Sequence, residues 1–76
     1  MPTTRLKMRM HPDTSKEMME QQADIYRYKL RTAMLSNVKL HPDTKNGESI
    51  CDVSSTDQFS LDLAVDLLLK EPAFSQ

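Results

Sequence analysis

The sequence predicts a small α+β domain, in which two helices pack on one face of a three-stranded, mixed sheet in the order β-α-β-β-α. Three observations lead to this prediction. Apolar and basic residues alternate over residues 5–10, a helical stripe of apolar residues runs through 19–33, and Asn46-Gly47 is a strong signal for a tight hairpin turn. With 76 residues the chain forms one domain at most, which we assign to residues 1–76.

The first predicted element is a strand over residues 4–11. Three apolar residues in it alternate with three basic ones, Leu6, Met8 and Met10 with Arg5, Lys7 and Arg9. This period of two is that of a strand with one buried face. Pro12 is expected to end the strand, because proline has no N–H to donate to the sheet.

The second predicted element is a helix over residues 15–35, a stretch that contains neither Gly nor Pro. Asp13, Thr14 and Ser15 are candidate N-caps, and Thr14 stands in capping-box spacing with Glu17. Five apolar residues follow one helical stripe, Met19, Ala23, Tyr26, Leu30 and Ala33. Acids fill the first half of this helix and bases the second half, which complements the helix dipole.

Two further strands are expected around the Asn46-Gly47 turn. Residues 38–40 alternate as a short strand, and 41–47 then read as a turn in which Pro42 stops the strand. Residues 49–54 return as the third strand.

The last predicted element is a helix over residues 59–70. A strand also fits the alternating apolar residues, but Asp62, Asp66 and Lys70 fall four residues apart and form one narrow polar stripe. Leu and Ala favour a helix over a strand. Pro72 is expected to end it.

This last helix also predicts association. Its circumference is apolar outside the polar stripe, so one small sheet does not cover it. Leu, Ile, Val and Phe make up only about a fifth of the chain, a supply close to the limit for a folded domain. Residues 1–40 carry eight bases and four acids, whereas 41–76 carry two bases and seven acids, so two copies could attract each other. We therefore expect a homodimer, with these partner-binding residues: Phe59, Leu61, Val65, Leu68 and Leu69.

The tetrapeptide His-Pro-Asp-Thr occurs twice, at 11–14 and 41–44. Our preferred interpretation is that each copy stops a strand and turns the chain, because Asp and Thr side chains cap turns. The alternative is a metal site, which would form if the two strand ends lay side by side. It would use two imidazoles and two carboxylates, those of His11, Asp13, His41 and Asp43. We expect no metal or other cofactor.

His41-Pro42-Asp43 also resembles the signature of J-domains, the co-chaperone modules that stimulate heat-shock chaperone ATPases. A basic helix precedes the tripeptide, and three later residues stand where the last helix of that family often has F, L and P: Phe59, Leu69 and Pro72. The resemblance covers residues 25–72. The chain departs from the family in its N-terminal strand, in the hairpin signal at Asn46-Gly47, and in having Leu40 where the family has an aromatic residue.

An alternative function is nucleic-acid binding. Five basic residues of the N-terminal half could contact phosphates, namely Arg5, Lys7, Arg9, Arg27 and Arg31. A solvated sheet face explains the first three equally well, and only Tyr26 and Tyr28 lie near them for stacking on bases.

Several function classes are disfavoured by composition. No run of about 18 apolar residues predicts a membrane span, and a single cysteine, Cys51, cannot form a disulfide within the chain. Together with the absence of an apolar leader, this favours the cytoplasm. So small a core leaves little room for a catalytic cleft. We therefore expect a non-catalytic binding or regulatory protein, of a size typical of phage or bacterial accessory proteins.

Overall fold

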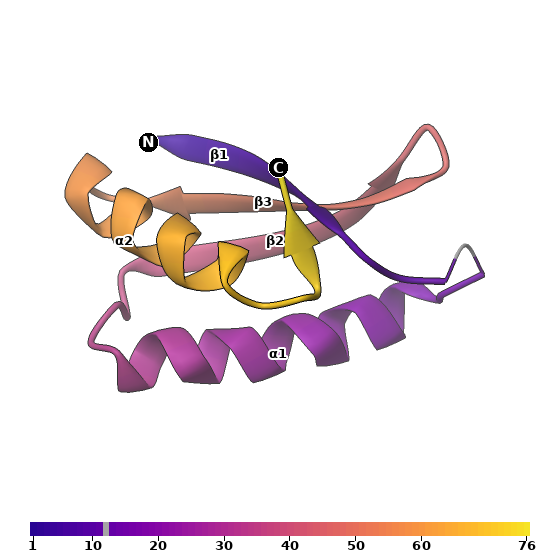
Figure 1. Cartoon of the computed structure of the whole chain (residues 1–76), viewed down its shortest axis with the longest axis horizontal. Helices are drawn as coiled ribbons and strands as arrows, with labels where there is room; N and C mark the ends of the chain where they lie inside the picture. Colours follow the sequence, from indigo (N-terminus) through magenta and orange to yellow (C-terminus); the bar gives the residue numbers. More distant parts are fainter. Residues whose placement is uncertain (12) are drawn as a thin grey trace.

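The structure is an α+β domain, as predicted (Figure 1). The computed structural model describes residues 1–11 and 13–76. Its elements are β1 (Thr3–Met8), α1 (Lys16–Thr32), β2 (Val38–Lys45), β3 (Glu48–Ser55), α2 (Gln58–Leu69) and β4 (Phe74–Ser75). This β-α-β-β-α-β connectivity is that of ferredoxin-like domains.

The sheet has four strands in the order β2-β3-β1-β4, and each neighbouring pair is antiparallel. The predictions of three strands and of a mixed sheet are therefore wrong. β4 escapes prediction because it has only two residues, which pair with the last two of β1. No parallel pair forms because β3 lies between β1 and β2, the two strands that α1 connects.

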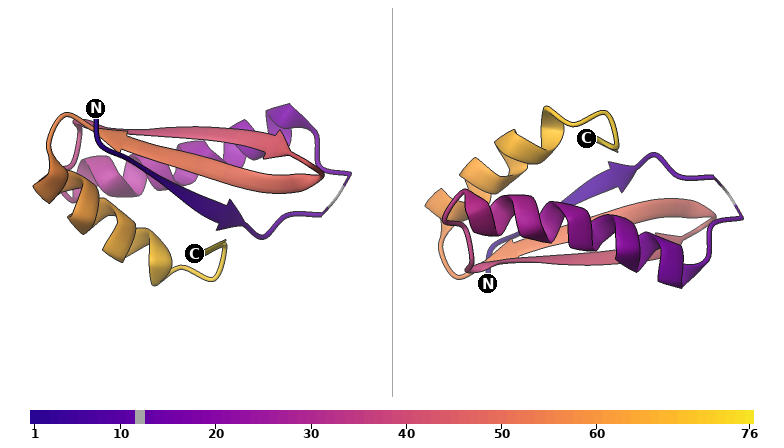
Figure 2. Two further views of the ribbon diagram at one scale, coloured as in Figure 1. Left: turned by 90° about the horizontal axis from the view of Figure 1, so that it is seen from above. Right: turned by 90° about the horizontal axis from the view of Figure 1, so that it is seen from below.

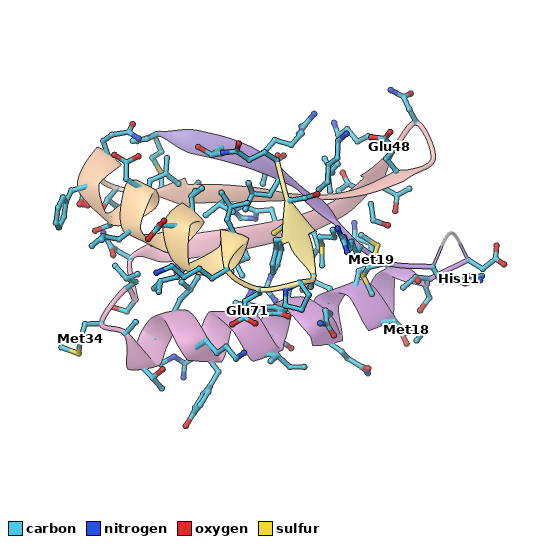
Figure 3. The ribbon with its side chains drawn as sticks, viewed as in Figure 1. His11, Met18, Met19, Met34, Glu48 and Glu71 are labelled. Atoms are coloured by element: carbon cyan, nitrogen blue, oxygen red, sulfur yellow. The ribbon has the colours of Figure 1, made fainter. Side chains whose placement is uncertain are left out.

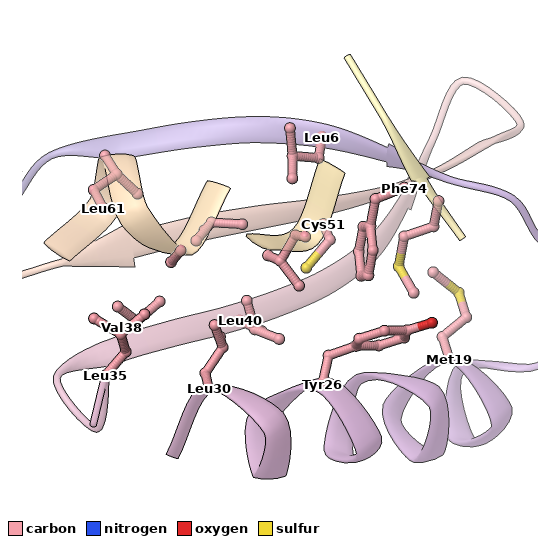
Figure 4. Close-up of a cluster of buried hydrophobic side chains, with 14 residues drawn as sticks. Leu6, Met19, Tyr26, Leu30, Leu35, Val38, Leu40, Cys51, Leu61 and Phe74 are labelled. Atoms are coloured by element: carbon pink, nitrogen blue, oxygen red, sulfur yellow. The ribbon is translucent and has the colours of Figure 1, made fainter. Parts of the chain in front are cut away.

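Both helices cover the same face of the sheet, as predicted (Figure 2). Side chains from both helices, β1, β2 and β3 meet there in one hydrophobic cluster (Figure 4). Leu6, Leu40 and Val53 come from the strands and are almost fully buried. Tyr26 of α1 packs edge-to-face on Phe74 of β4, with ring centroids 4.8 Å apart. The two-residue strand β4 thus closes one side of the core.

α1 begins one residue later than the predicted capping box implies. Its N-cap is Ser15, whose hydroxyl accepts a hydrogen bond from the backbone N–H of Met18. Thr14 is not the cap, because its hydroxyl donates to the carbonyl oxygen of His11 at 2.6 Å. The helix ends at Thr32, before the predicted 35, and Met34 takes a left-handed conformation with φ of 66°. The first strand ends at Met8, and the predicted strand-ending Pro12 lies outside the described residues.

α2 is a helix, so the helical interpretation of residues 59–70 is confirmed. Asp57 is its N-cap and accepts a hydrogen bond from the backbone N–H of Ser60 at 3.3 Å. The helix ends at Leu69, three residues before Pro72. Within the described part of the chain, neither helix combines the length and the apolar character needed to cross a membrane.

β2 runs straight through Pro42, so the predicted turn at 41–47 is too long. Only Asn46 and Gly47 form the turn, with positive φ at both, as a two-residue hairpin of type I′ requires. Pro42 fits within the strand because β2 lies at the end of the sheet. Alternate residues of an antiparallel edge strand turn their backbone groups away from the neighbouring strand. The carbonyl of Leu40 bonds Arg27 rather than β3, so Leu40 and Pro42 both face outward, and no sheet hydrogen bond is lost at Pro42.

The outer edge of β2 is obstructed at several points. Arg27 donates from Nη2 to the Leu40 carbonyl oxygen at 2.6 Å, and Pro42 has no N–H. The backbone N–H of Thr44 donates to its neighbour Asp43 at 2.8 Å, and that of Val38 donates to a carbonyl of the preceding turn. These contacts protect the edge from pairing with another strand.

Candidate protein-binding surface

α2 carries a continuous row of exposed apolar side chains, which we call the α2 stripe. It consists of Phe59, Leu63 and Leu67, with exposed fractions of 73%, 42% and 39%. Residues four apart lie one above the other on a helix, so the three side chains form a single ridge. The opposite side of α2 is fixed in the core by Leu61 and Leu68.

The predicted partner-binding residues are therefore divided between surface and core. Phe59 is exposed, and Val65 and Leu69 are partly buried against the core. Leu61 and Leu68 are 1% and 2% exposed and are not available to a partner in the folded domain. Leu61 and Leu68 lie opposite the polar stripe of the helix, which is the side that an amphipathic helix turns toward its own sheet.

Two residues of the stripe, Leu63 and Leu67, are missing from the prediction. The signal that could have identified them is their spacing from the polar stripe, because Leu63 stands three residues before Asp66 and Leu67 three residues before Lys70. Residues three apart are neighbours on a helix surface, so both leucines lie at the edge of the solvent side.

The surroundings of the stripe are acidic. The segment from Asp57 to Glu71 contains four acids and a single base, Lys70. Lys70 already pairs with Asp66 at 3.6 Å between its Nζ and a carboxylate oxygen. Asp62 accepts a hydrogen bond from the side-chain amide of Gln58 at 2.8 Å, a contact that leaves its charge uncompensated. Glu71 pairs with Lys29 of α1 at 3.1 Å, so the four acids exceed the two bases paired with them by two, and the surroundings of the ridge keep a net negative charge.

A groove of about 180 Å³ opens between α1 and α2 beside the stripe. It is lined by Tyr26, Lys29, Leu30, Ala33, Leu67, Leu68 and Glu71. Leu67 belongs to both the groove and the stripe, so the two features form one surface. Lys29 of α1 donates to Glu71 at 3.1 Å, and Figure 3 shows Glu71 between the two helices. Lys29 also lies 5.2 Å above the ring of Tyr26.

Exposed apolar side chains on α1 are more dispersed. Met18, Ile25 and Tyr28 are more than half exposed, and their spacing places them along one side of α1, but the polar Gln21 and Gln22 occupy that side between Met18 and Ile25. Met34 is 88% exposed and extends from the C-terminal end of α1 in Figure 3.

The five nucleic-acid candidates do not form one face. Arg5 and Lys7 lie on the open side of the sheet, whereas Arg27 and Arg31 belong to α1 on the covered side. Arg5 makes two hydrogen bonds to Asp52, at 2.8 and 3.1 Å. This contact raises the pKa of Arg5 and lowers the pKa of Asp52.

Arg27 is also committed to contacts within the chain. Its guanidinium donates to Glu20 at 2.9 Å, to Asp24 at 2.7 Å and to the carbonyl of Leu40. Burial alone would lower the pKa of Arg27, but its hydrogen bonds with the two acids outweigh burial and raise it. Arg9 and Arg31 are exposed. Arg27 and Arg31 line one groove of about 310 Å³ together with Lys39 and His41, whereas Arg5 and Lys7 lie on the open face of the sheet. Nucleic-acid binding stays a prediction, because the five candidates are divided between these two places.

The two His-Pro-Asp-Thr copies are not brought together. His11 and Asp13 approach each other at 3.8 Å but are largely exposed, and His11 lies beyond the end of β1 (Figure 3). His41 and Asp43 lie within β2, opposite residues of β3. The four-ligand metal arrangement is therefore wrong, and residues 1–11 and 13–76 contain no group of three or more His, Cys, Asp or Glu placed to hold a metal. The J-domain resemblance also loses its basis, because the tripeptide is part of a strand.

The contact between His41 and Ser54 is the arrangement closest to a nucleophile and its base. His41 Nε2 lies 3.4 Å from the Ser54 hydroxyl, at the long end of hydrogen-bond distances. The pair stands on the open face of the sheet, and a base in such a pair needs a third group to orient it. Asp52, the nearest carboxylate on the facing strand, is bound to Arg5.

Cys51 is fully buried in the core. Burial raises the pKa of its thiol from the ordinary value of 9.0 to about 11, so the thiol is protonated and unreactive at neutral pH.

Because the folded state holds the thiol proton more tightly than the unfolded state, Cys51 lowers stability as the pH rises. The stabilisation that comes from this raised pKa is fully present below pH 9 and is lost as the pH rises from 9 to about 11. The loss in unfolding free energy is up to about 2–3 kcal/mol. We expect the unfolding free energy of the wild type, from urea titrations, to fall more steeply in this range than that of Cys51→Ala. Parallel pH profiles for the two proteins would contradict the assignment.

Comparison of the chain with models of known protein families, with curated proteins and with solved structures finds no match.

Proposed function

We propose that this chain is a small, non-catalytic protein-binding module that acts through the α2 stripe. The observation that carries the proposal is the continuous exposure of Phe59, Leu63 and Leu67 on a helix whose other side is locked in the core. An apolar ridge with a polar rim is typical of a surface that a partner covers. Two or three large apolar anchors supply most of the binding free energy in such interfaces.

The edges of the sheet support the same proposal, because they present few free backbone groups to which a partner strand could bind. The outer edge of β2 is partly blocked by Arg27 and Pro42. At the other end of the sheet the free edge is short, because β4 has two residues and leaves only Thr3–Leu6 of β1 without a strand on that side. Strand addition needs a row of free backbone groups. A helix face is therefore the better route to a partner.

The homodimer expected from the sequence would use this same stripe, with a second copy as the partner. It remains a prediction. We also propose a cytoplasmic location, because the lone cysteine is held as a buried, protonated thiol, which suits a reducing compartment.

Selection from a library of random peptides tests the proposal without a known partner. The wild type is the bait, and the triple variant Phe59→Ser, Leu63→Ser, Leu67→Ser is the counter-bait. The matched control is Ile25→Ser, Tyr28→Ser, which removes exposed apolar side chains from α1. We expect peptides that bind the wild type and the control but lose about a hundredfold in affinity for the triple variant. If no selected peptide distinguishes the triple variant from the control, the stripe is not a binding surface.

A further inference from the structure

We infer that the partner covering the α2 stripe is an amphipathic helix with basic flanks, and that it places one apolar side chain in the groove between α1 and α2. The inference rests on the proposed function, because it specifies the partner of the same surface. Two independent features carry it, the charge around the stripe and the shape of the groove.

The charge favours a basic partner over a second copy. A two-fold axis that pairs two α2 helices in antiparallel orientation brings the same flank of each helix together. The flank that carries Asp62 and Asp66 would then meet itself. Lys70 pairs with Asp66, but Asp62 contacts only the neutral Gln58, so each copy would bring an uncompensated carboxylate to that flank. Like charges in an interface oppose binding, whereas lysine or arginine flanks on a partner would complement the acids.

The groove determines what the partner inserts. Its volume of about 180 Å³ is below the roughly 300–1,000 Å³ of small-molecule sites. Its walls include Leu30, Ala33 and Leu67, and the ion pair between Lys29 and Glu71 borders it. A space of this size and lining fits a single Leu or Met side chain. A helix lying along α2 can present such a side chain at the same i, i+4 spacing as its contacts to the stripe.

Two designed peptides of about 15 residues test the inference. Both carry leucines on one helical face, and the other face is lysine in one peptide and glutamate in the other. We expect the leucine/lysine peptide to bind the wild type in fluorescence polarisation and to shift the amide resonances of α2 and of Ala33. The leucine/glutamate peptide should bind at least tenfold more weakly.

Two pairs of variants distinguish the contribution of the groove to peptide binding from the contribution of the acidic residues. Ala33→Leu fills the groove from the end of α1 and should weaken the leucine/lysine peptide about tenfold, whereas Thr32→Leu next to it should not. Asp62→Lys, Asp66→Lys should weaken the same peptide about tenfold and improve the glutamate peptide. The control Asp13→Lys, Glu48→Lys changes the net charge equally, far from α2, and should have little effect.

The outcomes that would overturn the inference differ from those that would end the proposed function. Equal binding of the two peptides, or insensitivity to Ala33→Leu, overturns it. So does a wild-type dimer in sedimentation equilibrium that Leu63→Ser dissociates, because the occupant would then be a second copy. In each case stripe-dependent peptides from the random library would still support the proposed function. If neither designed nor selected peptides depend on the stripe, both fail.

Discussion

Replacing Leu68 by aspartate is expected to unfold the domain, whereas the same replacement at Leu67 is expected to leave it folded. Leu68 is 2% exposed and packs in the core, but Leu67 is 39% exposed on the α2 stripe. The two variants make the same chemical change at neighbouring positions, so they differ only in how deeply the replaced side chain is buried. Far-UV circular dichroism and urea unfolding of both variants measure the result.

The expected difference follows from burial. Losing a buried leucine costs about 1.5–3 kcal/mol, and an uncompensated carboxylate in the core costs several more. A domain of this length has a total stability of about 4–11 kcal/mol, so Leu68→Asp consumes most or all of it. Leu67→Asp loses only part of a side chain's burial, about 1 kcal/mol.

A folded Leu68→Asp protein with wild-type stability would contradict the orientation of α2. The pair also shows why Leu68 cannot be used to test association. An unfolded variant loses any interface, so a missing dimer would say nothing about the surface. Leu63 and Leu67 are the positions at which binding can be changed while the fold is kept.

Much of the fold could be predicted because its patterns are local. The alternation around Leu6 and Met8 indicates the first strand, and both residues are buried as predicted. Met19, Ala23, Tyr26 and Leu30 follow one helical stripe, and all four are buried. Asn46-Gly47 forms the turn because both positions take positive φ, a requirement that few other residue pairs meet.

The errors concern features that depend on distant parts of the chain. Proline usually ends a strand, but Pro42 stays within β2 because this strand lies at the edge and its missing N–H faces outward. Nothing near residue 42 indicates that position in the sheet. Phe74 gives no strand signal in a two-residue segment, and it pairs only because the end of β1 is free to receive it.

The sequence prediction and the structure place the candidate surface on the same helix, but Phe59 is the residue that the predicted set shares with the α2 stripe. An apolar circumference shows that α2 needs cover on several sides, yet it does not show which side the sheet takes. The polar residues supply that information, because Asp62, Asp66 and Lys70 mark solvent and the core lies opposite. The basic residues present the same difficulty. Arg27 and Arg5 look alike in sequence, but tertiary contacts place them on different sides of the sheet with acids of their own.

Opening the outer edge of β2 is expected to change the association state. In the variant Arg27→Met, Pro42→Val, the Leu40 carbonyl loses its donor and residue 42 gains an outward N–H. Both replacements keep apolar bulk, and valine favours strands. Each new interchain hydrogen bond contributes about 0.5–1.5 kcal/mol, and β2 offers several in register. We expect concentration-dependent association beyond that of the wild type in sedimentation velocity.

The two single variants should associate less than the double variant, because each leaves one obstruction in place. Lys39→Met is the matched control, since it removes a positive charge from the same strand but lies on the open face and frees no edge group. Circular dichroism should show that all four proteins keep the fold. A double variant that sediments like the wild type at high concentration would show that Arg27 and Pro42 do not protect the edge. The blocked edge of β2 would then no longer favour a helix surface over strand addition as the way this domain binds a partner.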